Sequence, residues 1–123
     1  MNIILLRHGQ SEWNLENRFT GWKDVSLTKL GVEEAQFSAE AIIENKYNIK
    51  SINTSLLNRA LETTEIVAKA LKFPKKNIKK NWRLNERHYG ALEGLNKSET
   101  AKKYGEKQVK IWRRSFDIPP PQV

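Results

Sequence analysis

The chain has 123 residues, which is enough for one domain with a hydrophobic core. It contains no cysteine, which excludes disulfides, thiolate catalysis and cysteine-bound zinc, and no apolar run approaches the ~20 residues that a membrane helix needs. The formal net charge of +8 predicts an anionic partner. Because the first residues show no secretory leader pattern, we expect a cytoplasmic protein that does not bind membranes.

The basic residues admit two classes of anionic partner, nucleic acid and small phosphorylated metabolites. Lysines gather at 75–80 and 102–110, but other residue types interrupt both clusters. Interrupted clusters are typical of solvated surfaces rather than of a nucleic-acid-binding arm. We therefore expect small anionic metabolites, and no nucleic acid, as partners.

The chain opens with an apolar run, Ile3–Leu6, that ends at Arg7-His8-Gly9. Such a run before a glycine turn predicts a buried strand of a parallel sheet, and ligands bind beyond the carboxyl ends of such strands. Gly9 would let the backbone approach a ligand closely. The forked donors of an arginine match phosphate and repel a metal cation, so Arg7 and His8 favour phosphoryl chemistry. The alternative is a surface turn with an incidental histidine.

A loop is predicted at 19–24, where a glycine lies between aromatic residues. The Thr20 hydroxyl and the Gly21 amide could donate hydrogen bonds to an anion, as turn amides do. Equally, Phe19 and Trp22 could hold the turn against the core. The residues themselves leave both interpretations open.

Two helices separated by a short strand are predicted next. Thr28 is a good N-cap for the first helix, which ends at 45–48. Its apolar face comprises Val32, Ala35, Ala39, Ile42 and Ile43. Residues 49–54 are typical of a short strand, and the second helix opens at 54–60, with Ser55 as its cap, and ends before Pro74. This order predicts a crossover connection and a parallel sheet.

Arg59 lies near the start of the second helix, at the end that faces the same crevice. The helix dipole disfavours a cation there, but an anion in the crevice would reverse that penalty. The alternative is a surface ion pair with Glu62 or Glu65.

After an extended stretch at 78–84, the block 85–90 is dense in groups that exchange protons or bind anions. Glu86 could act as a general acid or base if burial raises its pKa, and the Tyr89 hydroxyl could donate to a substrate oxygen. His88 fits the site or a structural hydrogen bond equally well.

Two more helices are predicted, at 97–104 and 106–116, with Val109, Trp112 and Phe116 facing inward. Lys97 also lies near a helix start, where, as for Arg59, a bound anion would offset the unfavourable helix dipole. Arg113 and Arg114 fit either a substrate clamp or a solvated helix end. Residues 117–123 are rich in proline and are typical of an extended linker.

Six stretches of the chain resemble the cofactor-dependent phosphoglycerate mutases, a family of the histidine phosphatase superfamily. They are residues 6–14, 19–22, 54–60, 82–90, 95–101 and 112–116. The Arg7-His8-Gly9 triplet marks only the wider superfamily. The blocks NERHYG at 85–90, GLNK at 94–97 and WRRSF at 112–116 point to the branch that acts on glycerate phosphates.

The resemblance implies an α/β fold with a mostly parallel central sheet flanked by helices. Residues 1–116 would be the N-terminal part of a single domain, and 117–123 its Pro-rich extended end. Family members continue for a comparable length, and that part carries a second pocket histidine with further strand and helix. Without it, we expect an exposed apolar sheet edge and association into homo-oligomers.

For function, the resemblance implies that 2,3-bisphosphoglycerate phosphorylates His8, which passes the group to 3-phosphoglycerate and yields 2-phosphoglycerate, in glycolysis and gluconeogenesis. Arg7 and Arg59 would clamp the phosphoryl group, Asn14 would add a hydrogen bond, and Glu86 would transfer the proton. No metal would be needed. The substrate's carboxylate and second phosphate would be held by Thr20, Gly21, Tyr89, Lys97, Arg113 and Arg114.

Two alternatives accompany this prediction. The first is a phosphatase of the same superfamily, in which water reaches the phosphohistidine. The second is a truncated, inactive remnant that only binds phosphorylated ligands.

Overall fold

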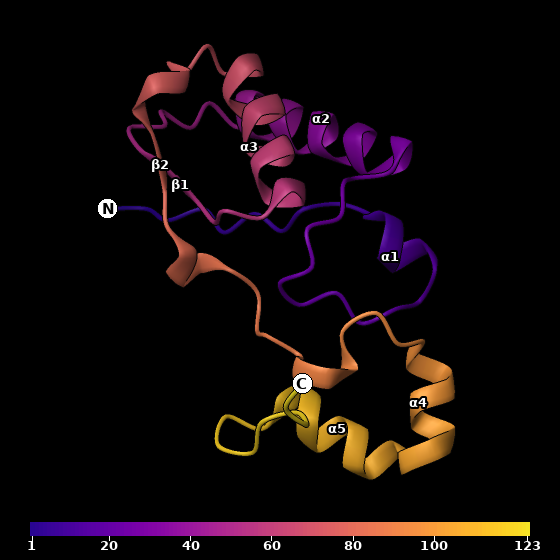
Figure 1. The fold of residues 1–123 in the computed structure, drawn as a ribbon. Coiled ribbons are helices and arrows are strands. Elements are labelled where there is room, and N and C mark those ends of the chain that lie inside the picture. The colour runs from indigo at the N-terminus through magenta and orange to yellow at the C-terminus, as the bar shows by residue number, and fades with distance from the viewer.

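A computed structural model describes the whole chain, residues 1–123. Figure 1 shows α2 and α3 with the strands β1 and β2 at one end of the molecule, and α4 and α5 at the other. The α-helices and strands are α1 (Glu12–Leu15), α2 (Lys29–Glu44), β1 (Ile52–Thr54), α3 (Asn58–Ala70), β2 (Ile78–Lys80), α4 (Lys97–Tyr104) and α5 (Glu106–Arg114). Three short 3₁₀ helices are η1 (Lys75–Asn77), η2 (Trp82–Leu84) and η3 (Gly90–Leu92).

The sheet consists of β1 and β2, which pair in parallel with Ile52 opposite Ile78 and Thr54 opposite Lys80. Helix α3 lies in the connection between them, as a parallel pair requires. The α/β class and the parallel sheet are therefore confirmed, although β1 begins three residues later than the predicted strand at 49–54.

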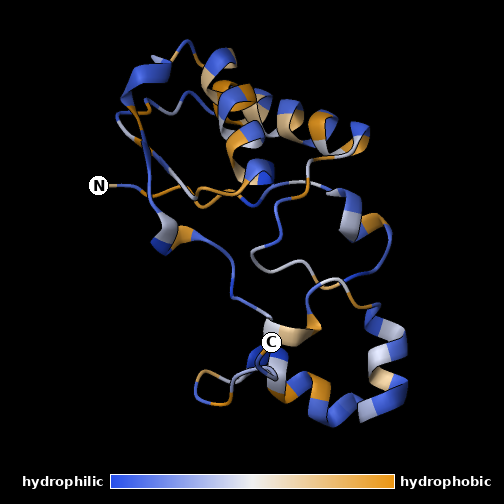
Figure 2. Cartoon of the chain, in the orientation of Figure 1, coloured by the Kyte–Doolittle hydropathy of each residue, from blue (hydrophilic) through white to orange (hydrophobic).

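The first predicted strand is absent from this chain. Residues 1–9 form no backbone–backbone hydrogen bond, and Ile3 and Leu5 are 74% and 92% exposed. The segment is an irregular apolar stretch of chain, coloured mostly orange in Figure 2. A strand needs a neighbour for its N–H and C=O groups, and β1 and β2 pair with each other rather than with this segment. The prediction of a buried strand at Ile3–Leu6 is thus wrong here.

Helix α2 begins and ends as predicted, because the Thr28 hydroxyl accepts a hydrogen bond from Gly31 N at 3.2 Å. Gly31 lies so close to the preceding loop that a Cβ on it would be 2.1 Å from Gln10 O. Gly9 also lies against this helix, because a Cβ on Gly9 would be 2.9 Å from Gly31 O. Gly9 therefore brings the His8 segment against α2 rather than against a ligand.

Three details of the predicted helices are wrong. Ile43 is 49% exposed, so the buried face of α2 stops at Ile42. Helix α3 is capped by Leu57, and the Ser55 hydroxyl instead accepts from Leu57 N at 3.4 Å, ahead of the helix. Phe116 is 97% exposed, because α5 ends at Arg114 before the chain can turn that ring inward.

Two small apolar clusters form the core, one at each end of the molecule. Phe19, Tyr89, Leu92 and Val109 pack together, with Trp112 against them. Ala39, Ile42 and Val67 pack between α2 and α3, with Ile49 and Leu71 against them. Phe19 and Tyr89 thus join the predicted anion-binding loop to the 85–90 block.

The Pro-rich end folds back on the molecule. Pro120 is buried, and Ala91 N donates to Pro121 O at 2.7 Å, so the segment lies against η3. Figure 1 shows the C-terminus at the same end of the molecule as α5. Residues 117–123 have no regular secondary structure, and Pro120 is the one buried residue among them.

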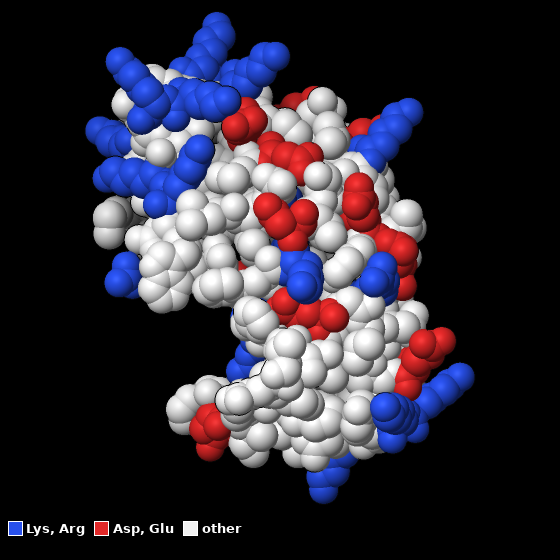
Figure 3. All heavy atoms as spheres, viewed as in Figure 1, with Lys and Arg blue, Asp and Glu red and all other residues white.

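The surface charge is uneven. Figure 3 shows Lys and Arg gathered at the end of the molecule that carries η1 and β2. Lys75, Lys76, Lys79 and Lys80 are all exposed, as predicted for a solvated cluster. None of the helices combines the length and the apolar character that crossing a membrane requires.

Candidate functional site

His8 lies at the end of the N-terminal segment and is half-buried. Its Nδ1–H donates to Gly9 O at 2.6 Å, because a carbonyl oxygen can only accept. Burial lowers the pKa of His8 below 6.5, and the Arg59 and Arg7 charges lower it further against the opposing effects of Gly9 O and Glu86. The ring is therefore neutral at pH 7, with its proton on Nδ1 and a lone pair on Nε2.

Arg59 is buried, at 1% exposure, and holds three partners. Its Nη1 donates to Lys23 O at 2.9 Å, and its Nη2 donates to Gly21 O at 2.6 Å and to Glu86 Oε2 at 2.9 Å. The alternative of a surface pair with Glu62 or Glu65 is wrong. Arg59 instead ties the start of α3 to the loop at 20–24 and to the 85–90 block.

Glu86 is paired with Arg59 but is not enclosed, because its side chain is 41% exposed. Its backbone carbonyl accepts a hydrogen bond from Trp22 Nε1 at 2.6 Å. The burial on which the sequence made a proton-transfer role depend is therefore absent, while contacts with Arg59 and Trp22 fix the position of Glu86.

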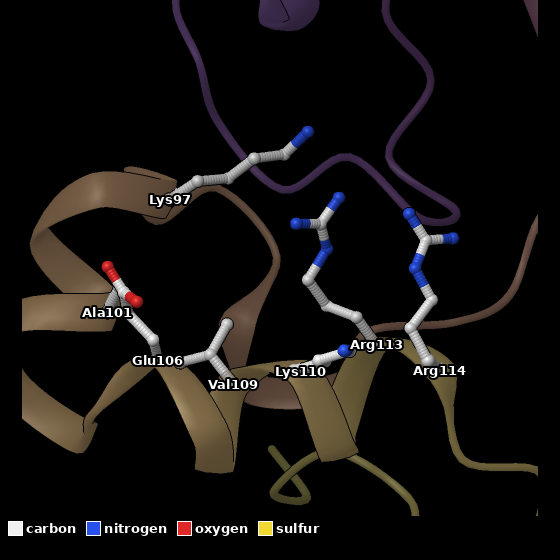
Figure 4. A pocket seen from close by; sticks show the side chains of 7 residues that line it. All are labelled: Lys97, Ala101, Glu106, Val109, Lys110, Arg113 and Arg114. Atoms are coloured by element: carbon white, nitrogen blue, oxygen red, sulfur yellow. The ribbon is translucent and has the colours of Figure 1, made fainter.

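Three cations from α4 and α5 point toward the same side of a cavity (Figure 4): Lys97, Arg113 and Arg114. The cavity has a volume of about 340 Å³. Burial lowers the pKa of Lys97, and the charges of Arg113, Arg7 and Arg114 lower it further, while Glu86 opposes them. The buried Nε of Arg113 has no hydrogen-bond partner. Glu106 is the one carboxylate in the lining, so cations outnumber it there, and such a lining suits an anionic ligand.

Several of the predicted cations act electrostatically on His8 or on Lys97. Arg7 and Glu86 act on the pKa of both His8 and Lys97. Arg59 acts on His8, and the two arginines of α5 act on Lys97. The charges of Arg7 and Glu86 thus couple His8 to Lys97, while the cavity itself is lined only by residues of 97–114.

The remaining predicted residues are held by local contacts. Asn14 forms a capping box with Ser11, since its Oδ1 accepts from Ser11 N at 3.0 Å, so only its amide NH₂ remains to donate. Thr20 and Gly21 are buried in the loop that Arg59 holds. Tyr89 is 8% exposed, with its ring centroid 5.3 Å from that of Phe19.

Sequence reasoning missed Glu93, which fixes the loop. Its Oε2 accepts hydrogen bonds from Trp22 N and Tyr89 N, both at 3.0 Å, and the side chain is 5% exposed. His88 Nδ1 accepts from Gly90 N at 2.8 Å, which makes His88 a structural hydrogen-bonder. A single glutamate between Leu92 and Gly94 gives no pattern that could have revealed this role.

Residues 3–123 match the family model of the histidine phosphatase superfamily (branch 1). The chain therefore belongs to that superfamily.

Within it, the chain is similar to curated proteins named 2,3-bisphosphoglycerate-dependent phosphoglycerate mutase. It is 57% identical to that of Zymomonas mobilis over 121 residues, which are 98% of this chain and 53% of the relative. It is 54% identical to that of Buchnera aphidicola, covering 98% and 52%. These relatives confirm the resemblance recognised in the motifs, and the chain spans about half their length.

Among solved structures, the fold is similar to a mycobacterial glucosyl-3-phosphoglycerate phosphatase. The TM-score is 0.79 at 27% identity, covering 95% of this chain and 52% of that one. The arrangement of helices and strands is therefore shared with a protein whose name states a different reaction on a phosphoglycerate ester.

Proposed function

We propose that this chain serves the 2,3-bisphosphoglycerate-dependent interconversion of 3-phosphoglycerate and 2-phosphoglycerate, a reaction of glycolysis and gluconeogenesis in the cytoplasm. The observation that carries the proposal is His8 with its proton held on Nδ1 by Gly9 O and Nε2 left free, beside the charges of a hydrogen-bonded Arg59–Glu86 pair. The names of relatives that are 54–57% identical support it.

His8 would act as the nucleophile through Nε2. A bond forms between Nε2 and phosphorus while the bond from phosphorus to the donor oxygen breaks, and the phosphoryl group later leaves for the acceptor hydroxyl. A half-buried neutral imidazole is competent for this step, because it does not need to lose a proton first. Its Nδ1–H bond to Gly9 O holds the ring in the productive tautomer.

Arg7 and Arg59 would stabilise the negative charge that spreads over the phosphoryl oxygens, and the Asn14 amide would add a hydrogen bond. Each such donor is typically worth about 10²- to 10³-fold in rate. Arg59 suits this role because its guanidinium is already fixed by Lys23 O and Gly21 O and needs little reorganisation.

Glu86 would accept the proton of the substrate hydroxyl and return it. Its carboxylate is exposed enough to meet a substrate and is aimed by its contact with Arg59. Proton transfer of this kind contributes about 10²- to 10⁴-fold.

The cations at the other end of the site would hold the carboxylate and second phosphate of the ligand. 2,3-Bisphosphoglycerate fits this site by charge, since Arg7, Arg59, Lys97, Arg113 and Arg114 outnumber Glu86, and it would supply the phosphoryl group that primes His8. Thr20, Gly21 and Tyr89 would complete the binding wall. In this scheme the arginines provide the positive charge that a metal provides elsewhere.

A phosphatase activity is the second candidate. The similarity in fold to a glucosyl-3-phosphoglycerate phosphatase and the partial exposure of His8 favour it, because water could reach the phosphohistidine. Hydrolysis would release inorganic phosphate without isomerising the substrate.

One assay separates these candidates. The purified chain is incubated with 3-phosphoglycerate and a trace of 2,3-bisphosphoglycerate, and both 2-phosphoglycerate and inorganic phosphate are followed. The proposal expects 2-phosphoglycerate to exceed phosphate, and excess phosphate would favour the phosphatase. Neither product, together with measurable ligand binding, would identify a chain that only binds phosphorylated ligands.

A further inference from the structure

Glu86 and Arg87 are adjacent in the chain, but their side chains contact opposite ends of the molecule. Glu86 pairs with Arg59 at the start of α3. Arg87 donates from Nη1 to Trp112 O at 3.0 Å and from Nη2 to Ser115 O, at the end of α5. This dipeptide therefore connects the His8 end of the site to the helix that carries Arg113 and Arg114.

The contact made by Arg87 has a clear physical basis. The last carbonyls of a helix lack intrahelical partners, and a cation is favoured there by the helix dipole. At the end of α5, Ser115 N reaches only Ile111 O, so Trp112 O remains for Arg87. A guanidinium can span two carbonyls with its two Nη groups, which an ammonium on a flexible stem does less well.

The cavity runs along α5 from Glu106 to Arg114 and so includes the last turn of the helix. Arg113 and Arg114 are its last two residues, and both side chains point to the same side as Lys97 in Figure 4. The carbonyls that Arg87 holds lie immediately before and after these two residues. The two hydrogen bonds from Arg87 therefore bracket the turn that carries both cations, in addition to the packing of Val109 and Trp112.

We propose that Arg87 is a positioning residue that holds the last turn of α5, and with it Arg113 and Arg114, at a fixed distance from Glu86. This inference rests on the proposed function, because the spacing it sets matters for a ligand that reaches both ends of the site. A ligand that occupies only the His8 end would not depend on Arg87.

The test compares two phosphoryl donors of different length. Phosphoramidate is small and lacks a carboxylate, whereas 2,3-bisphosphoglycerate carries a carboxylate and a second phosphate. The rate of His8 phosphorylation by each is measured by intact mass in the unmodified chain, Arg87→Ala, Arg87→Lys and Arg83→Ala. Arg83 is exposed and its side chain lies over Trp82 at 5.1 Å, so its removal takes away the same charge without loosening α5.

We expect Arg87→Ala to slow phosphorylation by 2,3-bisphosphoglycerate by about tenfold or more, with no change for phosphoramidate. Arg87→Lys should recover part of the loss, and Arg83→Ala should match the unmodified chain. Equal slowing with both donors would indicate general destabilisation and overturn the proposal, as would no slowing with either.

A binding measurement separates failure of this inference from failure of the proposed function. If neither donor phosphorylates the unmodified chain, the proposed function fails, and the affinity for 3-phosphoglycerate is measured by calorimetry instead. Weaker binding by Arg87→Ala than by Arg83→Ala would then support the positioning role. Equal affinity, or no binding by the unmodified chain, would overturn it.

Discussion

The N-terminal segment, residues 1–9, and the loops that Arg59 and Glu93 contact have no α-helix or strand, yet they differ in the contacts that hold them in place. Ile3–Leu6 has apolar side chains but no backbone hydrogen-bond partner and stays exposed. The loops at 20–24 and 85–90 are polar, but the buried side chains of Arg59 and Glu93 accept or donate five hydrogen bonds to them. Hydrogen bonds from buried side chains therefore hold the loops of this site in place, whereas apolar side chains alone do not hold the N-terminal segment.

Removing the guanidinium of Arg59 should have the largest effect on the phosphorylation rate. In Arg59→Ala, Gly21 O and Lys23 O lose their donor and Glu86 loses its cation. We expect the His8 phosphorylation rate to fall about 10²- to 10³-fold. Because Glu86 is partly exposed, the free energy of unfolding should fall by only about 2 kcal/mol. Urea denaturation and the phosphorylation rate measure the two effects.

Arg59→Lys is the matched control, since it keeps the charge and loses the fork. It should recover stability better than rate, because a single ammonium cannot reach three partners. A rate equal to that of the unmodified chain would contradict the role given to the guanidinium.

The pH dependence of His8 phosphorylation should show the next largest effect. Since burial lowers the pKa of His8 below 6.5, the rate should stay level through neutral pH. It should fall by about tenfold per pH unit once the pH drops below that lowered pKa, as Nε2 becomes protonated. Stability should also decline as the pH falls below 6.5, because the unfolded chain then binds the proton more readily.

The check is a pH–rate profile together with urea midpoints of the unmodified chain and His8→Ala. The variant should lose the part of the stability change that belongs to His8. A rate that already declines above pH 6.5 would contradict a lowered pKa.

Loss of Glu93 should affect the phosphorylation rate less than loss of Arg59 does, and should act mainly on the stability of the loops. Glu93→Ala leaves Trp22 N and Tyr89 N without their acceptor, which should cost about 1–3 kcal/mol. Glu93→Gln keeps an acceptor oxygen and should cost less than half of that. Urea midpoints of the two variants test this order, and equal losses would show that the charge matters more than the hydrogen bonds.

Charges introduced into the N-terminal segment, residues 1–9, should change the free energy of unfolding least. Ile3→Lys combined with Leu5→Lys should alter the free energy of unfolding by about 0.5 kcal/mol or less, because both side chains are exposed. The same change should abolish the self-association expected of an uncovered apolar segment. Sedimentation of the variant beside the unmodified chain provides the measurement, and an unchanged dimer would place the contact elsewhere.

Sequence patterns predicted the helices well because caps and apolar spacing are local. Thr28 caps α2, and Ala35, Ala39 and Ile42 are buried on its apolar face as expected, whereas the cap at Ser55 and the burial of Ile43 were predicted wrongly. The strand at Ile3–Leu6 failed because strand formation needs a neighbour that an apolar run cannot specify. The contacts of Arg59, Arg87 and Glu93 could not be predicted for a similar reason. Each joins residues at least four positions apart through loops, and a local sequence pattern does not show which residues will meet.

The most direct test of the central claim, that His8 is the phosphoryl acceptor, is the intact mass of the chain before and after brief exposure to 2,3-bisphosphoglycerate. We expect one acid-labile phosphoryl group on the unmodified chain and on His88→Ala, and none on His8→Ala. Failure of the unmodified chain to gain the group, or its gain by His8→Ala, would contradict the account.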